Sequence, residues 1–297
     1  MKRLIILLLL TSGIKAQMVI ITTPGDSAMN CGNYALAISL FKDMVKQERK
    51  TANDSVVADI DMYNISCAYA RMNNKDSAFA WLNRYCDLDG LKDPDYYNLI
   101  DDPRWIQVRE RASRQYFKEH PGYNKEKVFA LWRIDIQDQA FYAAIKILTN
   151  VPGYDKEAVK QLWAKKDSLN KVNLAKIREM GFPPKEEVGV GNLTSMIMVI
   201  QHSTLDVQKE FFPAVKKMAD KGDIRKEIFA LLTDRILVSE GKKQIYGSQV
   251  KTDSTGKQVF FPMEDELNVN KRRAEMGLEP IEAYAKRFGF EYHYDPK

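Results

Sequence analysis

The sequence predicts a mainly α protein with two helical domains and one β-hairpin. Apolar residues recur at spacings of three and four along most of the chain, which is the period of amphipathic helices. Turn signals rich in glycine, proline and asparagine divide these stretches into segments of helix length. Only after Gly241 does the pattern change, to short strand-like stretches at residues 244–250 and 257–261. We therefore expect a hairpin near residues 244–261 in an otherwise helical chain.

Residues 1–16 have the pattern of a secretory signal peptide. Lys2 and Arg3 are basic, residues 4–10 are apolar, and Ala16 is a small residue at a suitable cleavage position. The apolar stretch is too short for a stable membrane anchor, so we expect cleavage after Ala16, with an uncleaved anchor as the alternative. No later stretch has 18 consecutive apolar residues. The sequence thus predicts an exported chain, periplasmic or secreted, with no membrane span after cleavage.

The net charge of the exported chain argues against one class of partner. Cleavage would remove the basic residues Lys2, Arg3 and Lys15 and no acidic residue, which lowers the net charge from +5 to +2. A nucleic-acid-binding protein normally presents a clustered basic surface, and so small a net charge does not favour one. The remaining chain is long enough for one large or two ordinary domains.

The three cysteines, Cys31, Cys67 and Cys86, form no recognisable framework. An odd number in an exported chain leaves at least one thiol unpaired. Their spacing fits neither a disulfide scaffold nor a CxxC metal site. We interpret Cys67 as a small buried helix residue, with a Cys31–Cys86 or Cys67–Cys86 bridge as the alternative. The sequence therefore predicts no metal site and no cofactor.

Residues 24–117 are predicted to form paired amphipathic helices. Apolar residues at helical spacing cover residues 34–45, 56–70 and 78–85, and turn signals precede each stretch. Ala37 with Phe41 and Ala78 with Leu82 occupy equivalent places 41 residues apart. That spacing is compatible with a repeated helical hairpin, in which small residues let helices approach closely.

This segment resembles tetratricopeptide repeats. The residues that carry the resemblance are Gly32, Tyr34, Ala37 and Phe41 in one unit and Tyr63, Ala70, Ala78 and Leu82 in the next. Repeats so few in number usually need a neighbour to cap them. The resemblance implies a groove that binds a protein or peptide partner; the alternative is a helical platform packed against the second domain.

Residues 124–290 are predicted to form a second helical domain. Asn124 can cap a helix that ends near residues 135–139, and a charged helix follows over residues 156–180. Asn192 or Thr194 can cap a short apolar helix that runs into Gln201 and His202.

The last predicted helices of this domain flank the hairpin. Asp223 can cap the helix that precedes it, and two helices separated by residues 277–280 end the chain. The helix after Asp223 contains Thr233-Asp234-Arg235 within an otherwise apolar run. Because such a run has no wholly solvated face, some of these three polar side chains must pack against other residues and need partners.

His202 and Asp206 are the first candidate site residues. His202 lies at the end of an apolar helix, and Asp206 would share its face if the helix continued. A carboxylate beside an imidazole orients it and raises its basicity, which suits a general base. A satisfied core histidine is the alternative.

Asp234 and Arg235 are the second candidates. Adjacent helical residues do not face each other, so each needs another partner. The side chains available by type are Asp138, Gln139, Asp206, Asp265 and Arg272. An ion-pair network between helices is the favoured interpretation, and an acid or anion-binding site is the alternative.

Gln244, Tyr246 and Gln249 are the third candidates. Strand alternation places Gln244 and Tyr246 on one face, and a bulge at Gly247 would bring Gln249 to them. Two amides and a phenol could then bind a polar ligand; without the bulge they belong to a half-exposed hairpin. No HExxH, GxSxG or phosphate-loop motif occurs in the sequence.

The second half of the chain resembles an uncharacterised bacterial domain family. The resemblance runs from Val128 to Phe288 and rests on an ordered series of motifs. These are Trp132, Asp138-Gln139, Gly181-Phe182-Pro183, Gln201-His202, Leu232-Thr233-Asp234-Arg235, Gln244, Tyr246-Gly247-Ser248-Gln249, Arg272-Arg273-Ala274 and Gly277-Leu278. A family without an assigned activity implies no function, but it implies that these polar residues belong to one domain and one shared network.

Two functions follow as expectations from the sequence. The first is an exported interaction or scaffold protein that binds its partner through the repeat-like domain. The second is a hydrolase with His202 as base, Asp206 or Asp234 as its partner, and Arg235, Gln244 and Tyr246 as substrate contacts. The choice between them depends on whether these side chains converge in an open cleft.

Overall fold

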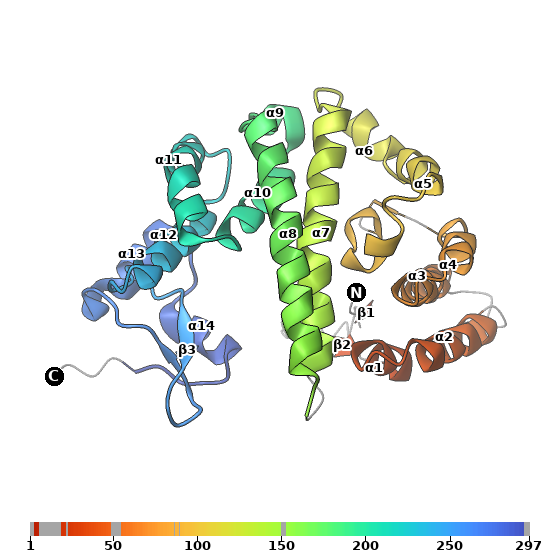
Figure 1. Cartoon of the computed structure of the whole chain (residues 1–297), viewed down its shortest axis with the longest axis horizontal. Coiled ribbons are helices and arrows are strands. Elements are labelled where there is room, and N and C mark those ends of the chain that lie inside the picture. Colours follow the sequence, from red (N-terminus) through yellow and green to blue (C-terminus); the bar gives the residue numbers. More distant parts are fainter. Residues whose placement is uncertain are drawn as a thin grey trace, which may run out of the picture. The chain divides into compact units, whose positions relative to one another are not determined.

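The computed structural model describes residues 3–5, 19–21, 23–48, 55–85, 87–88, 90–149 and 153–293. Helices dominate this part of the chain, and its strands form two antiparallel pairs (Figure 1). The prediction of a mainly α fold is confirmed. The chain divides into two compact units: unit 1 comprises residues 1–121 and 135–166, and unit 2 comprises residues 122–134 and 167–297. The domains expected at 24–117 and 124–290 follow the same order, but unit 1 also takes residues 135–166.

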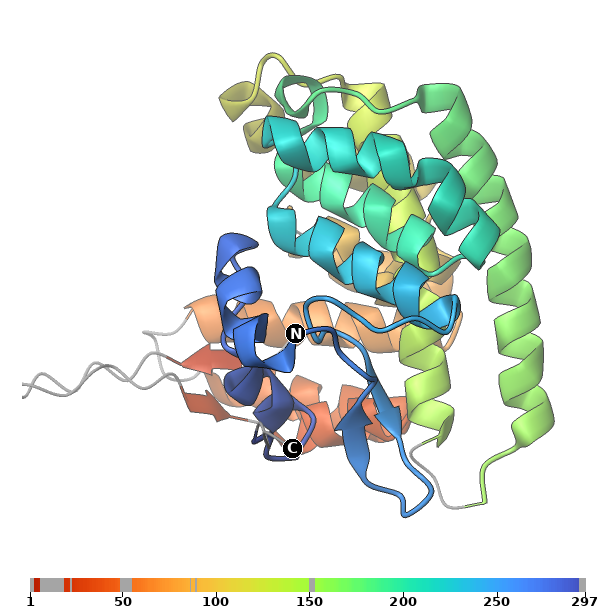
Figure 2. The ribbon, with the colours of Figure 1, turned by 90° about the vertical axis from the view of Figure 1, so that its left-hand side faces the viewer.

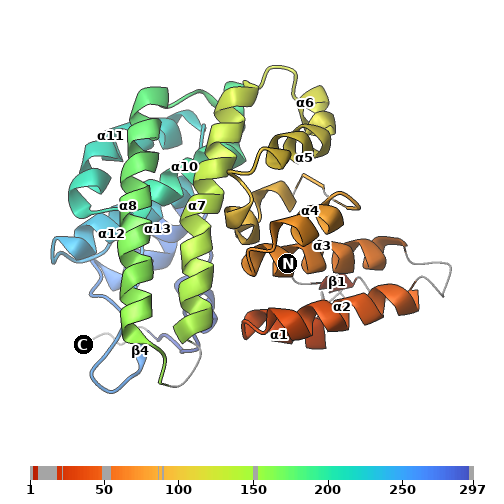
Figure 3. The ribbon, with the colours of Figure 1, turned by 45° about the vertical axis from the view of Figure 1, so that its right-hand side comes forward.

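The first helices of unit 1 pack each on the next. α1 (Pro24–Asn30) packs on α2 (Tyr34–Glu48), α2 packs on α3 (Ser55–Arg71), and α3 packs on α4 (Lys75–Leu82). Figure 3 shows α2, α3 and α4 following one another in red to orange. The 3-10 helices η1 (Gly90–Lys92) and η2 (Pro94–Asn98) and the helices α5 (Arg104–Ala112) and α6 (Arg114–Glu119) follow.

The residues with the repeat-like spacing lie in the interior of these helices. Ala37, Phe41, Ala78 and Leu82 are all fully buried. The small side chains permit the close approach of neighbouring helices, and the large ones fill the space one turn later. This packing is what paired helices require, while the resemblance to tetratricopeptide repeats stays a prediction.

The N-terminal strands β1 (Arg3–Ile5) and β2 (Val19–Ile21) pair antiparallel. Of the predicted signal peptide, only β1 is described; the rest of residues 1–16 lies outside the described residues. Export therefore stays a prediction. No helix in the described part combines the length and apolar character that crossing a membrane requires.

The two long helices α7 (Lys125–Thr149) and α8 (Lys156–Met180) contribute to both units. The predicted bounds of α8 are confirmed. The predicted end of α7 near residues 135–139 was wrong, because Gln137 and Asp138 are buried side chains within a continuous helix. Asn124 caps α7 as expected, since its Oδ1 accepts the Lys127 N–H at 3.1 Å.

Unit 2 continues with four helices before the hairpin and two after it. These are α9 (Lys185–Val188), α10 (Val190–Gln201), α11 (Leu205–Lys221), α12 (Lys226–Ser239), α13 (Val269–Glu275), preceded by the 3-10 helix η3 (Glu266–Asn268), and α14 (Ile281–Arg287). Figure 2 shows α10, α11 and α12 in green to cyan, with the hairpin and the last helices in blue.

Two predicted helix caps of unit 2 were wrong. The Asn192 side chain is buried inside α10, where it donates to the Val188 carbonyl at 2.6 Å and accepts the Trp132 Nε1–H at 2.8 Å. Thr194 also lies inside α10, which begins at Val190. Asp223 does not cap α12, which begins three residues later at Lys226. The local pattern assigned the Asn192 side chain to a cap, but in the structure this side chain forms a tertiary hydrogen bond with Trp132 instead.

The predicted hairpin is confirmed with a shorter first strand. β3 (Val250–Thr252) pairs antiparallel with β4 (Gln258–Phe260), so that Val250 faces Phe260 and Thr252 faces Gln258. Residues 244–249, expected to belong to the first strand, form a loop instead, with one isolated bridge between Gln244 and Met263. The hydrogen bonds that replace strand pairing in this loop come from side chains of unit 2.

Candidate functional site

The carboxylate of Asp234 holds the loop of residues 244–249, called here the motif loop. Asp234 lies on α12 and is 0% exposed. Its Oδ1 accepts the N–H of Ile245 at 2.7 Å and of Tyr246 at 3.0 Å, and its Oδ2 accepts the N–H of Ser248 at 2.9 Å. A buried charge is stable only with such compensation, and N–H donors to a carboxylate form strong hydrogen bonds.

The Gln244 side chain closes the motif loop on itself. Its Oε1 accepts the Gln249 N–H at 2.8 Å, and its Nε2 donates to the carbonyls of Gln249 at 3.0 Å and Phe261 at 2.9 Å. Gln244 is 0% exposed, so its amide serves the backbone and is not presented to solvent. The predicted strand alternation missed this role, because a loop conformation brings the amide back to its own chain.

Two arginines and a tyrosine donate hydrogen bonds to the carbonyl groups of the same loop. Arg272 donates to the Ile245 carbonyl at 2.9 Å, and Arg273 to the Tyr246 carbonyl at 2.7 Å. The Tyr284 hydroxyl donates to the Ser248 carbonyl at 3.1 Å. Arg273 is 1% exposed and lies 4.9 Å from the centre of the Tyr284 ring, an arrangement that stabilises a buried guanidinium.

The motif loop is therefore fixed through both ends of its peptide groups: the Asp234 carboxylate accepts from the N–H groups, and two guanidinium groups and a tyrosine hydroxyl donate to the carbonyls. The favoured expectation of ion pairs for Asp234 is corrected, because its partners are backbone N–H groups. Of the expected partner residues, Arg272 and Asp265 pair with each other at 3.3 Å. These bonds form one network that joins residues from several of the family motifs. Within the described residues, this network fixes the backbone conformation of the motif loop.

The remaining candidates at this loop are partly accessible. Tyr246 is half-buried, and burial together with the nearby charge of Asp234 raises the pKa of its hydroxyl. The Gln249 side chain donates to the Ser248 hydroxyl at 3.0 Å. The Arg235 Nε is buried and, within the described residues, has no hydrogen-bond partner. These three side chains could contact a ligand, but none is placed as a nucleophile beside a base.

His202 and Asp206 are separated by a break in the helix. α10 ends at Gln201 and α11 begins at Leu205, so the condition for a shared helical face is not met. Asp206 is exposed in the first turn of α11, and His202 is half-buried. The neighbouring Gln201 is buried and donates to the Ile228 carbonyl at 3.1 Å, which ties α10 to α12.

Asp138 and Gln139 lie on the part of α7 that belongs to unit 1. Asp138 is 1% exposed, and its carboxylate accepts from Gln139 Nε2 at 2.8 Å and pairs with Lys166 Nζ at 3.3 Å. Lys166, also 1% exposed, lies 4.8 Å from the centre of the Tyr142 ring. Sequence reasoning missed Lys166, since a lysine in a strongly charged helix is expected to face solvent.

Comparison with known families agrees with this grouping of motifs. The model of a family of unknown function, DUF6624, matches residues 136–295, which is more than half of the chain. The chain belongs to this family. The resemblance of its second half to an uncharacterised domain family is thereby confirmed. No curated protein and no solved structure matches the chain.

A groove within the DUF6624 segment lies between the hairpin and the chain that follows α14. It has a volume of about 1080 Å³, and its aromatic lining comes from Phe260 and Phe261 at the end of the hairpin and from Phe288, Phe290 and Tyr292 at and after the end of α14. Ring centres lie 5.1 Å apart for Phe260 and Phe290 and 5.3 Å apart for Phe260 and Tyr292.

A second polar cluster lies in unit 1, outside the DUF6624 match. It comprises Cys67 on α3, Asp93, which caps η2, and Asp95 within η2. Arg71 pairs with Asp95, and the Tyr63 hydroxyl donates to Asp93. Burial, then the charges of the two aspartates, raises the pKa of the Cys67 thiol. Cys31 is exposed with a free thiol, and Cys86 lies outside the described residues.

This cluster predicts a pH-dependent stability. Burial and the charge of Asp93 raise the pKa of Asp95 from 3.8 to about 6, although Arg71 opposes the shift. Because the folded chain holds the proton more tightly than the unfolded chain, the stabilisation is complete below pH 4 and is lost as the pH rises through 6. Urea unfolding is measured between pH 4 and pH 7 in a chelating buffer. Over this range the free energy of unfolding of wild type should fall by about 1–3 kcal/mol relative to that of Asp95→Asn. A difference between the two proteins that is constant over this range would contradict the assignment.

Proposed function

We propose that the chain is an exported binding protein whose DUF6624 segment takes up an extended polypeptide along the free edge of β4. The observation that carries the proposal is the aromatic groove beside that edge. Export rests on the signal-peptide pattern of residues 1–16. The occupant is a segment in strand conformation with apolar side chains on one face.

The backbone of β4 supports a strand-like occupant. In the hairpin, Asp253 N–H donates to the Lys257 carbonyl and Phe261 N–H to the Gln249 carbonyl. In this register the N–H and C=O groups of Gln258 and Phe260 point away from β3. Within the described residues these groups form no hydrogen bond. An unpaired edge of this kind is the usual template for the addition of a strand by another chain.

The side chains of the groove support an apolar face on that occupant. Phe288 is 42% exposed at the groove, and its ring packs edge-to-face on Tyr284 with ring centres 5.1 Å apart. Phe260 packs edge-to-face on Phe290 and on Tyr292, and all three rings line the groove. Backbone pairing gives affinity for any strand, and aromatic contacts at alternate positions give selectivity for apolar side chains.

The two functions expected from sequence receive unequal support. The hydrolase would need Asp206 or Asp234 as a partner for His202. The break between α10 and α11 removes the helical face that His202 and Asp206 were expected to share, and both oxygens of Asp234 accept backbone N–H groups. Gln244 is likewise fully occupied. A protein-binding role has the groove in its favour, and the repeat-like helices of unit 1, first expected to hold the partner, remain a second candidate surface for a scaffold role.

A pair of proline variants tests the binding edge. Gln258→Pro removes an outward N–H from β4, and Thr252→Pro removes the equivalent N–H from the opposite edge of β3. Both variants lose the same side-chain bond between Gln258 and Thr252, so they are matched in their effect on the hairpin. Wild-type protein is screened on an array of 15-residue peptides with alternating apolar and polar residues, and the Kd of the best peptide is measured by fluorescence anisotropy.

We expect Gln258→Pro to weaken peptide binding at least about tenfold and Thr252→Pro to leave it within about twofold. Phe288→Ala, a change at an exposed ring, should weaken binding as well while the melting temperature is retained. Equal Kd values for the two proline variants, or an array on which wild type binds no peptide, would contradict the proposal.

A further inference from the structure

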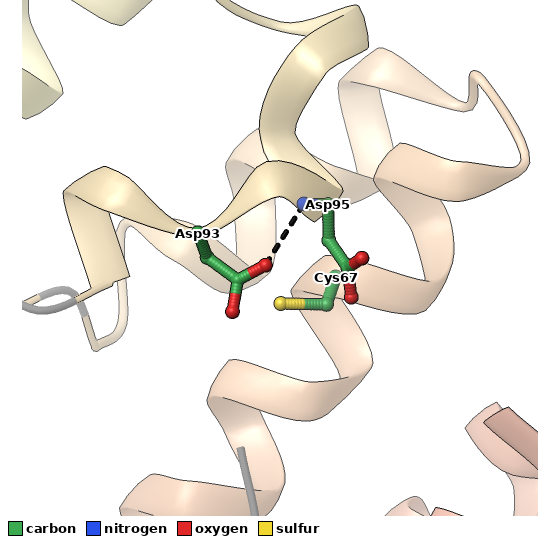
Figure 4. Close-up of side chains that lie close together, drawn as sticks. All are labelled: Cys67, Asp93 and Asp95. Atoms are coloured by element: carbon green, nitrogen blue, oxygen red, sulfur yellow. Dashed lines mark hydrogen bonds between the residues drawn. The ribbon is translucent and has the colours of Figure 1, made fainter. Parts of the chain in front are cut away.

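The cluster of Cys67, Asp93 and Asp95 brings together three side chains that are ligands of transition metals in proteins. Figure 4 shows the thiol of Cys67 beside the two carboxylates. One ligand atom from each residue lies within 4.8 Å of the other two. A tetrahedral zinc ion with one sulfur and two oxygen ligands holds these atoms about 3.3–3.7 Å apart. The side chains would therefore need only a small contraction to enclose such an ion.

The position of the thiol is a separate observation from the acidic pair. Cys67 is 2% exposed, and a buried cysteine ordinarily lies among apolar side chains. Here its sulfur lies beside two carboxylates, and Arg71 pairs with one of them, Asp95. The Tyr63 hydroxyl donates to Asp93 and the Tyr96 hydroxyl bonds to Ser66, and both hydroxyls also hydrogen bond with the Cys67 sulfur.

Once the Cys67 thiol is ionised, the charge of the cluster balances that of a divalent cation. Asp93 and Asp95 contribute two negative charges when ionised, and Arg71 contributes one positive charge. With the thiol ionised as well, the sum is two negative charges in a largely buried site. A divalent cation brings this sum to zero, which removes the cost of burying uncompensated charge.

We propose that Cys67, Asp93 and Asp95 bind one zinc ion. Zinc accepts thiolate and carboxylate ligands together, whereas calcium and magnesium take oxygen ligands alone. The Cys67 thiol loses its proton to solvent on binding. The Asp95 side chain is 19% exposed, which leaves a route for the ion from solvent and a position for a water ligand. This site lies in unit 1 and does not depend on the proposed peptide groove.

Metal content of the purified full chain tests the proposal. The protein is treated with chelator, reloaded with zinc, freed of unbound metal and measured by mass spectrometry of the element. We expect about one zinc per chain for wild type and for the control Cys31→Ser, which changes an exposed free thiol. Cys67→Ser and Asp93→Asn should lose at least about nine-tenths of the bound zinc.

Folding and ligand identity are checked on the same samples. Asp93→Asn retains an oxygen that can still cap η2, so its helical circular dichroism should match wild type. Cobalt substituted for zinc should give a sulfur-to-cobalt charge-transfer band in wild type and Cys31→Ser but not in Cys67→Ser. Absence of bound zinc from folded wild type, or unchanged zinc content in both site variants, would overturn the proposal.

Discussion

Replacement of Asp234 with alanine is expected to destabilise unit 2 by about 3–5 kcal/mol. The change leaves the N–H groups of Ile245, Tyr246 and Ser248 buried without acceptors. It also leaves the buried guanidinium of Arg273 without the opposite charge of Asp234, which acts on it across the motif loop. Since small domains are stable by only about 5–15 kcal/mol, urea unfolding followed by circular dichroism should detect the loss readily.

Two further variants separate this effect from a general loss of charge. Asp234→Asn keeps one carbonyl oxygen as an acceptor, and we expect an intermediate loss of about 1–3 kcal/mol. Asp206→Ala removes an exposed carboxylate from the first turn of α11 and should change stability by less than about 0.5 kcal/mol. Similar losses for Asp234→Ala and Asp206→Ala would show that the motif loop does not depend on Asp234.

Gly247→Ala is expected to destabilise the same loop by about 2–4 kcal/mol. Gly247 has a φ of +66°, a conformation that costs alanine energy wherever it occurs. An added Cβ would also lie 2.5 Å from Ile281 Cδ1 and 2.6 Å from Met263 Sδ. Both neighbours belong to a small buried core cluster with Val269, so neither can move without disturbing it. The loss should appear as a lower urea midpoint with an unchanged m-value.

Gly256→Ala provides the matched control for Gly247. Gly256 lies in the turn of the hairpin with a φ of +83°, and an added Cβ there meets nothing within 4 Å. This variant should lose only the stability that alanine costs at a positive φ, about 1–2 kcal/mol. The difference between the two variants measures the steric contribution at Gly247. If both glycines gave the same loss, the close packing of the motif loop against Ile281 and Met263 would be refuted.

Local periodicity was sufficient to predict the elements of this fold. The bounds of α8 and the hairpin after Gly241 follow from residue spacing, because helices and strands repeat every 3.6 and 2 residues. The same reasoning failed where a polar residue has a distant partner. Asn192 was expected to cap a helix, and its buried bond to Trp132 spans 60 residues.

The candidate site shows the same difference between what local sequence predicts and what distant partners decide. The sequence indicated that Asp234 needed partners, since a charge interrupts an apolar helix. It could not identify them, because the partners are backbone N–H groups 11 to 14 residues later, which every residue other than proline carries. For the same reason the motifs grouped Gln244 with Arg273, but the sequence assigned Gln244 to ligand contact and could not show that both side chains bond to the loop backbone.

The sequence by itself determined that this is a mainly α chain of the DUF6624 family, and the family motifs identified the residues of one network. Only the tertiary structure decided that the network fixes a loop, that β4 presents an unpaired edge beside aromatic rings, and that Cys67 faces Asp93 and Asp95. The physical reason is that helix and strand patterns depend on residues that are close together in the sequence. Hydrogen-bond partners, groove walls and metal ligands are brought together by packing, across separations that no local pattern records.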